Sequence, residues 1–104
     1  MEIKAKDVES FAVWLFGRIY TQVSAVVWVD ARGVPAGFEQ FDSFAGLPEA
    51  LSAPEGTSAV LVSNHPEGNL SPSEDDARNL RRIEALLGAR PRLFIVCEDS
   101  CICA

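Results

Sequence analysis

Residues 58–76, SAVLVSNHPEGNLSPSEDD, decide the fold of this chain of 104 residues. The apolar run at residues 58–63 predicts a short buried strand, and the residues that follow it favour a turn. Signals for a helix start come next. Ser71 fits the N-cap, Pro72 fits the first helical position, and Glu74 completes a capping box. The stretch therefore indicates a strand, a loop and a helix in direct succession.

The pattern continues on both sides of this stretch. After it, the helix carries an apolar stripe made of Ala77, Leu80, Ile83 and Leu87. Gly88 fits the end of the helix, and residues 92–98 predict a last strand. Before it, the chain predicts a helix, a strand hairpin and one short helix, over residues 7–21, 23–30 with 34–42, and 46–54. Pro35 and Gly37 favour an edge position or a bulge in the hairpin's second strand. The ending DSCICA either extends the sheet or frays.

This alternation predicts the fold class α/β (α+β). We expect a mixed β-sheet flanked by helices, in the order helix, strand, strand, short helix, strand, helix, strand. The length suits one domain over residues 1–104. The first helix is apolar on two sides, so it is either buried on both or covers a partner chain. Trp14 and Phe16 make a homo-oligomer through this helix one hypothesis.

The composition disfavours two classes of partner, nucleic acids and membranes. The net charge of −6 disfavours direct nucleic-acid binding, and Arg78, Arg81 and Arg82 stand among acids on an expected solvated helix face. No apolar run approaches the ~20 residues that a membrane span needs, and no signal peptide is visible. Three cysteines crowd the last eight residues, Cys97, Cys101 and Cys103. We expect reduced thiols in a cytoplasmic protein.

Candidate chemistry gathers around the only histidine. His65 follows the strand, and Ser73 and Asp76 lie three apart in the first turn of the helix, on one face. A polar focus outside the carboxyl end of a strand is where open α/β folds place their sites. The alternative is purely structural. A histidine in a turn and a well-capped helix start would look the same.

The spacing resembles the signature H-x-H-x7-S-x-x-D of the JAB/MPN (JAMM) metalloproteases. Seven residues separate His65 from Ser73, and two separate Ser73 from Asp76. The longer pattern N-H-P-x-G-x-x-x-P-S-x-x-D, which runs here from Asn64 to Asp76, resembles that of the RadC-like branch. The resemblance implies a JAB/MPN (cytidine-deaminase-like) architecture. It also implies a zinc held by two His and one Asp, a glutamate as general base, and a serine that donates to the oxyanion.

Residue by residue, the resemblance makes His65 the second metal histidine, Asp76 the metal carboxylate and Ser73 the oxyanion donor. Ser63 stands where the first metal histidine belongs, and Gln22 falls at the position of the base. Zinc therefore remains a candidate cofactor at an incomplete site. Glu39 is the nearest carboxylate that could replace the base. One of the three cysteines could replace the missing ligand, or all three could be buried apolar residues.

Three functions stay open. The favoured one is a catalytically impaired RadC-like JAB/MPN domain that binds or scaffolds a protein partner. The second is a zinc-dependent metallohydrolase that cleaves peptide or isopeptide bonds with a rearranged site. The third is a small homodimeric interaction domain. DNA repair, suggested only by the name of the branch, has little physical support in an acidic chain.

Overall fold

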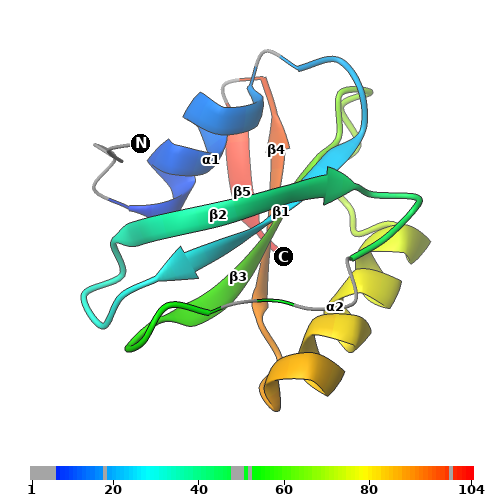
Figure 1. Cartoon of the computed structure of the whole chain (residues 1–104). Helices are drawn as coiled ribbons and strands as arrows, with labels where there is room; N and C mark the ends of the chain where they lie inside the picture. Colours follow the sequence, from blue (N-terminus) through cyan, green and yellow to red (C-terminus); the bar gives the residue numbers. More distant parts are fainter. Residues whose placement is uncertain (1–6, 18, 48–50, 52, 99) are drawn as a thin grey trace.

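The computed structural model describes residues 7–17, 19–47, 51, 53–98 and 100–104. These residues form a small α+β structure in which a five-stranded mixed sheet lies between two helices (Figure 1). The elements are α1 (Val8–Phe16), β1 (Val23–Val29), β2 (Pro35–Asp42), β3 (Ser58–Asn64), α2 (Glu74–Leu87), β4 (Arg92–Cys97) and β5 (Ser100–Cys103). The predicted mixed sheet flanked by helices is confirmed.

The sheet has the strand order β2-β1-β3-β4-β5. Neighbouring strands are antiparallel except β3 and β4, which are parallel and are joined by α2 as a crossover. The ending DSCICA extends the sheet, because β5 pairs with β4 from Phe94↔Cys103 to Cys97↔Ser100. Of the short helix predicted at residues 46–54, four residues (48–50 and 52) lie outside the described residues, and none of the other five is helical.

Both sequence signals in the second hairpin strand are confirmed. β2 is an edge strand, and its register against β1 shifts between Trp28 and Val29. Trp28 pairs with Gly37 and Val29 pairs with Pro35, so one residue is bulged out between them. At an edge, Pro35 removes no hydrogen bond that a neighbouring strand would need.

The prediction that the first helix reaches residue 21 is wrong, because α1 ends at Phe16. The side-chain amide of Asn64 in β3 donates to the carbonyls of Ile19 (2.7 Å) and Thr21 (2.9 Å). Those carbonyls are therefore bonded to the sheet rather than to a continuing helix. Gly17 follows the helix, and a Cβ there would lie 2.6 Å from the carbonyl oxygen of Glu98. The turn after β4 thus packs directly against the helix end.

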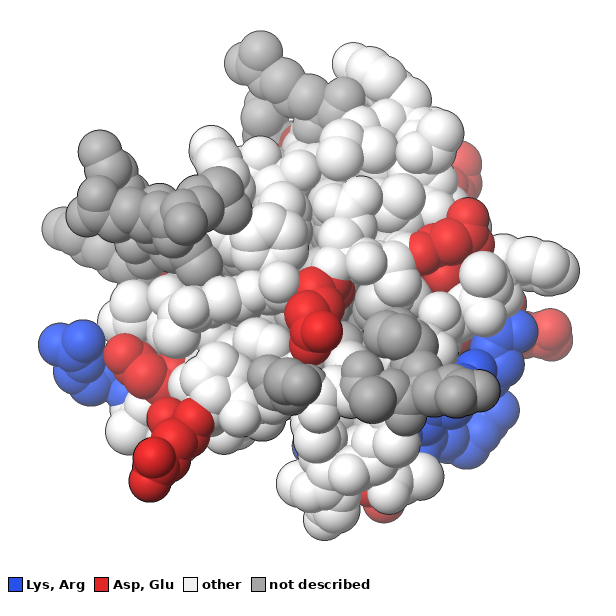
Figure 2. Space-filling model, viewed as in Figure 1, with Lys and Arg blue, Asp and Glu red and all other residues white. Residues whose placement is uncertain are grey.

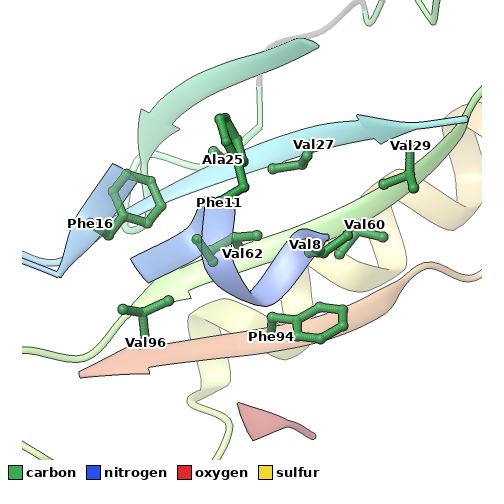
Figure 3. Close-up of a cluster of buried hydrophobic side chains, with 11 residues drawn as sticks. Val8, Phe11, Phe16, Ala25, Val27, Val29, Val60, Val62, Phe94 and Val96 are labelled. Carbon is green, nitrogen blue, oxygen red and sulfur yellow. The ribbon is translucent and has the colours of Figure 1, made fainter. Parts of the chain in front are cut away.

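α1 covers one face of the sheet with a continuous apolar core. Figure 3 shows Val8, Phe11 and Phe16 of the helix facing alternate residues of three strands. Those strand residues are Ala25, Val27, Val29, Val60, Val62, Phe94 and Val96. Alternation along a strand sends the intervening residues to the other face. The near-continuous apolar runs of β1, β3 and β4 therefore serve two cores.

α2 covers the opposite face. Its Leu80 and Ile83 pack with Leu47 and with residues of three strands: Val26, Trp28, Leu61, Leu93 and Ile95. At its amino-terminal end the buried residues are polar instead, namely Asp76 and Asn79. The expected stripe is thus correct at Leu80 and Ile83, whereas Ala77 and Leu87 are only partly buried. No helix among the described residues is long and apolar enough to cross a membrane.

The prediction that Ser71 caps this helix is wrong by two residues. Ser73 is the N-cap, since its Oγ accepts from the amide of Asp76 (3.1 Å) and its own amide donates to Asp76 Oδ2 (3.0 Å). The capping box therefore uses Asp76 rather than Glu74. Ser71 instead donates its amide to Asn69 Oδ1 (2.9 Å) in the loop. Gly88 ends the helix with φ +77, as expected.

Candidate functional site

The site forms where β3 ends and α2 begins. His65 follows the last residue of β3, and its amide donates to the carbonyl of Val96 in β4 (2.8 Å), which continues the parallel ladder. Asp76 lies in the first turn of α2. The loop between them brings the two side chains together, with His65 Nε2 at 2.8 Å from Asp76 Oδ2. His65 is 1% exposed and Asp76 is fully buried.

The hydrogen bonds of the imidazole fix where its protons lie. His65 Nδ1 is 2.6 Å from the carbonyl oxygen of Asn69, which can only accept, so Nδ1 donates. A neutral ring with that proton would present a bare lone pair at Nε2. Asp76 Oδ2 also accepts from the Ser73 amide, so two acceptor atoms would face each other. The 2.8 Å contact is therefore a hydrogen bond with a shared proton between Nε2 and Oδ2.

Ser73 joins this pair through its backbone. Its amide donates to Asp76 Oδ2 and so holds the carboxylate that faces His65, while its side-chain Oγ accepts from the backbone amide of Asp76. The hydroxyl oxygen is used as an acceptor, while its proton stays free to donate elsewhere. The three residues singled out by spacing, His65, Ser73 and Asp76, are thus brought together in one hydrogen-bonded group.

Ser63 is fully buried and belongs to a chain of hydroxyls. Ser24 Oγ lies 2.6 Å from Ser43 Oγ and donates over 3.5 Å to Ser63 Oγ. Asn79 of α2 donates to the Ser43 carbonyl (3.2 Å), so this buried group of serines is also hydrogen-bonded to the helix. Sequence reasoning overlooked Ser24, Ser43 and Asn79. A lone polar residue within an apolar strand, Ser24 in VSAVVWV, was the signal that could have found the first of them, whereas Ser43 follows Asp42 in a turn and gives no such signal.

Gln22 and Glu39, the two candidates for a base, lie in different places. Gln22 is exposed, just before β1, and the β1–β3 register carried beyond Ser24↔Ser63 places it opposite His65. Glu39 pairs with Val26, which pairs with Leu61 in β3. Leu61 is four residues before His65, or about 13 Å along an extended strand. The structure therefore brings Gln22, but not Glu39, to the level of the histidine. One carboxylate oxygen of Glu39 is buried without a hydrogen-bond partner among the described residues.

Two of the cysteines lie on the other face of the sheet. Cys101 and Cys103 pair with Val96 and Phe94, whose side chains belong to the α1 core. Burial raises the pKa of the Cys101 thiol to about 11, and the carboxylate of Glu9 adds to the shift. A protonated thiol is a poor metal ligand. Cys101 and Cys103 are thus separated from His65 and Asp76 by the sheet itself.

These residues fall one donor short of a catalytic zinc site, which uses three protein ligands. His65 Nε2 and Asp76 Oδ2 would be two of them, and the Nδ1 bond to a carbonyl is typical of a metal-binding histidine. A neutral serine hydroxyl is a weak ligand, and that of Ser63 already bonds to Ser24. Within the described part of the chain, no three His, Cys, Asp or Glu side chains are grouped so that they could hold a metal.

Comparison with known proteins adds no assignment to this geometry. The sequence matches no protein-family model, and it matches no curated protein.

Proposed function

We propose that this chain is a catalytically impaired RadC-like JAB/MPN domain that acts as a binding or scaffolding module. The observation that carries the proposal is the 2.8 Å contact between His65 Nε2 and Asp76 Oδ2 at a strand–loop–helix junction. The motif's spacing requires these two groups to converge, whereas an accidental match would leave them unconstrained. The helix, strand and crossover order is also compatible with the JAB/MPN architecture.

Loss of catalysis is the second part of the proposal, and three features support it. Ser63 occupies the position of a metal histidine, and Gln22 occupies the position of the base; an amide cannot accept and return a proton. The retained pair is buried to 1% exposure or less, so a substrate carbonyl has no access to it. In this proposal a proton, rather than a metal ion, holds His65 and Asp76 together.

Metal analysis of protein purified without chelator tests the proposal. We expect no stoichiometric zinc. Full occupancy that disappears in both His65→Ala and Asp76→Ala would show a working metal centre and overturn the claim of impairment. The variants are needed because zinc bound by the three cysteines would survive them.

A repair experiment tests the family separately from the loss of catalysis. Ser63→His together with Gln22→Glu restores both missing groups and is expected to raise zinc affinity, measured by competition with a chelating dye. Ser58→His is the matched control, because it adds a histidine to β3 at an exposed position far from the motif histidine. A repaired variant that binds zinc no better than this control would mean that the register or the family is wrong.

The metallohydrolase remains the second candidate on one observation. Asp76 Oδ1 is buried and has no hydrogen-bond partner among the described residues, so one carboxylate oxygen is free to take a ligand. This function predicts metal-dependent cleavage of a peptide or isopeptide bond that Asp76→Ala abolishes. Activity that persists in His65→Ala with chelator present would come from another source and would remove this candidate.

The homodimer proposal also has one supporting observation. Trp14 on α1 is 65% exposed, although its ring lies 5.7 Å from that of the buried Phe11. An exposed tryptophan on an apolar helix is typical of a protein–protein interface. Light scattering over a concentration series measures the mass in solution. This proposal expects a dimer that Trp14→Glu dissociates, and a monomer at high concentration removes it.

A further inference from the structure

The positive charge of this acidic chain is concentrated on and after α2. Five of its nine Lys and Arg residues lie between Arg78 and Arg92, where Glu84 is the single acid. Figure 2 shows basic side chains gathered at the lower right, where Figure 1 places α2. A chain with a net charge of −6 thus carries one positively charged segment.

Two of these arginines already have partners. Arg78 bonds to the carbonyls of Ser43 and Phe44 and pairs with Asp75 at 3.4 Å, so it fastens α2 to the loop after β2. Arg92 lies 5.3 Å from the centre of the Phe94 ring, on the α1 face of the sheet. Arg81, Arg82 and Arg90 are exposed, and within the described residues none of them forms an ion pair.

Arg81 and Arg90 lie on the rim of a groove between α2 and β4. The groove has a volume of about 560 Å³ and runs from Pro72, just before α2, to the Arg90–Leu93 segment beyond it. Ala77 and Leu80 form part of its helix wall, and Leu93 lies on the sheet side. Glu84 is also on the rim. The groove therefore combines an apolar lining with guanidinium groups that have no partner in the described chain.

We propose that this groove binds an extended acidic segment of a protein partner, with an apolar side chain seated between carboxylates that pair with Arg81 and Arg90. Charge complementarity selects the occupant, because guanidinium forks bind carboxylates in bidentate fashion. The α2 residues that line the groove run from Ala77 to Glu84, which spans about 10 Å, the length of about three residues of extended chain. The inference is independent of the zinc-family proposal, since no residue of the His65 site is involved.

A nucleic acid fits this surface poorly. Phosphate binding to a duplex needs several clustered cations, whereas Glu84 lies between Arg81 and Arg90 in sequence and the rest of the chain is acidic. An acidic peptide can place its carboxylates at the two arginines and its apolar residue opposite Leu80 instead. Glu84 then limits the affinity, so its removal should strengthen the same interaction.

The experiment uses the ¹⁵N-labelled full chain and a pool of short peptides with two acidic positions flanking one apolar position. We expect amide shifts confined to Ala77–Glu84 and Arg90–Leu93, weakening as salt is raised. Arg81→Glu with Arg90→Glu should lower the affinity at least about tenfold, as expected for two lost charge-assisted bonds. Glu84→Gln should raise it. Arg32→Glu, compared with Arg81→Glu alone, is the charge-matched control, because Arg32 lies in the β1–β2 turn and pairs with Asp30.

Other results of the same experiment would overturn the proposal. A pool in which Lys replaces the acidic positions should not bind, and equal binding would show that charge plays no part. Shifts spread over the whole surface, an equal loss in the Arg32→Glu variant, or no shift at millimolar peptide would each overturn the site. If a short DNA duplex shifted the same amides and bound more tightly than the peptides, the partner would be a nucleic acid and not an acidic peptide.

Discussion

His65 and Asp76 illustrate how two buried polar residues depend on each other. Both nitrogens of His65 are hydrogen-bonded, to Asn69 and to Asp76, and Asp76 Oδ2 accepts from His65 and Ser73. The proton that they share compensates for the burial of a carboxylate. If either partner is removed, the other remains inside the protein without its counterpart.

We therefore predict that His65→Ala lowers the free energy of unfolding by about 3–5 kcal/mol, the usual cost of breaking a buried pair. Asp76→Ala should cost a similar amount, and the double variant should cost less than the two single losses combined. Urea denaturation measures all three. Glu67→Ala is the control, since Glu67 is exposed and 4.0 Å from His65 Nδ1. A histidine variant no less stable than this control would show that the pair contributes little.

Cys101 gives a prediction about pH. Burial beside Glu9 raises the pKa of its thiol from the ordinary value of 9.0 to about 11. The folded chain thus keeps a proton that the unfolded chain releases. This contribution to stability is complete below pH 9 and disappears as pH rises to about 11. Wild type should therefore lose more stability across this window than Cys101→Ala, as measured by urea denaturation at a series of pH values. Equal losses in the two proteins would contradict the shift.

At the scale of elements, the start of α2 distinguishes two serines. Ser73 caps the helix, whereas among the described residues Ser71 bonds only through its amide, to Asn69. Ser73→Ala should cost about 1 kcal/mol of stability, the usual value for an N-cap, and Ser71→Ala should cost much less. Thermal unfolding of the two variants gives the comparison. Greater loss in Ser71→Ala would return the cap to the position that the sequence alone suggests.

The sequence predicts the presence of the helices and strands better than the residues at which the helices begin and end. The strands and the glycine that ends α2 follow from local patterns, and all of these were confirmed within about two residues. The end of α1 depends on Asn64, far along the chain, which bonds to the carbonyls of Ile19 and Thr21. The cap at Ser73 depends on Asp76, whose carboxylate also bonds to His65. The partner of α1 lies more than 40 residues away along the chain and is invisible to periodicity, whereas the cap at Ser73 is local and is ambiguous because Ser71 offers the same kind of signal.

The candidate site was predictable to a similar extent. Spacing alone indicated that His65, Ser73 and Asp76 would meet, because a strand exit and a helix start face each other across a short loop. The hydroxyls of Ser24 and Ser43 were not foreseen. Ser24 looks like a single polar interruption in a strand pattern, and the sheet register places it opposite the buried Ser63. Ser43 lies in the turn after β2, and only its hydrogen bond to Ser24 links it to the group.

At the scale of the whole molecule, one sheet separates two apolar cores. Phe11 belongs to the core under α1, and Ile83 belongs to the core under α2. Because successive residues of β1, β3 and β4 serve opposite cores, neither core can be lost while these strands stay in place. The same strands that bury Val62 against α1 present Leu61 to α2. The two faces should therefore unfold together.

We predict that Phe11→Ala costs about 3–5 kcal/mol and Ile83→Ala about 2–5 kcal/mol, both as losses from one shared transition. In a Trp14→Phe background, fluorescence reports on the buried Trp28 of the α2 core, and circular dichroism reports on the whole chain. The two probes should give one midpoint in each variant, because a two-state unit has no stable half. Phe11→Ala tests this most directly, since it damages the face opposite Trp28. A fluorescence midpoint that stays at the wild-type value while the circular dichroism midpoint falls would show two independent cores.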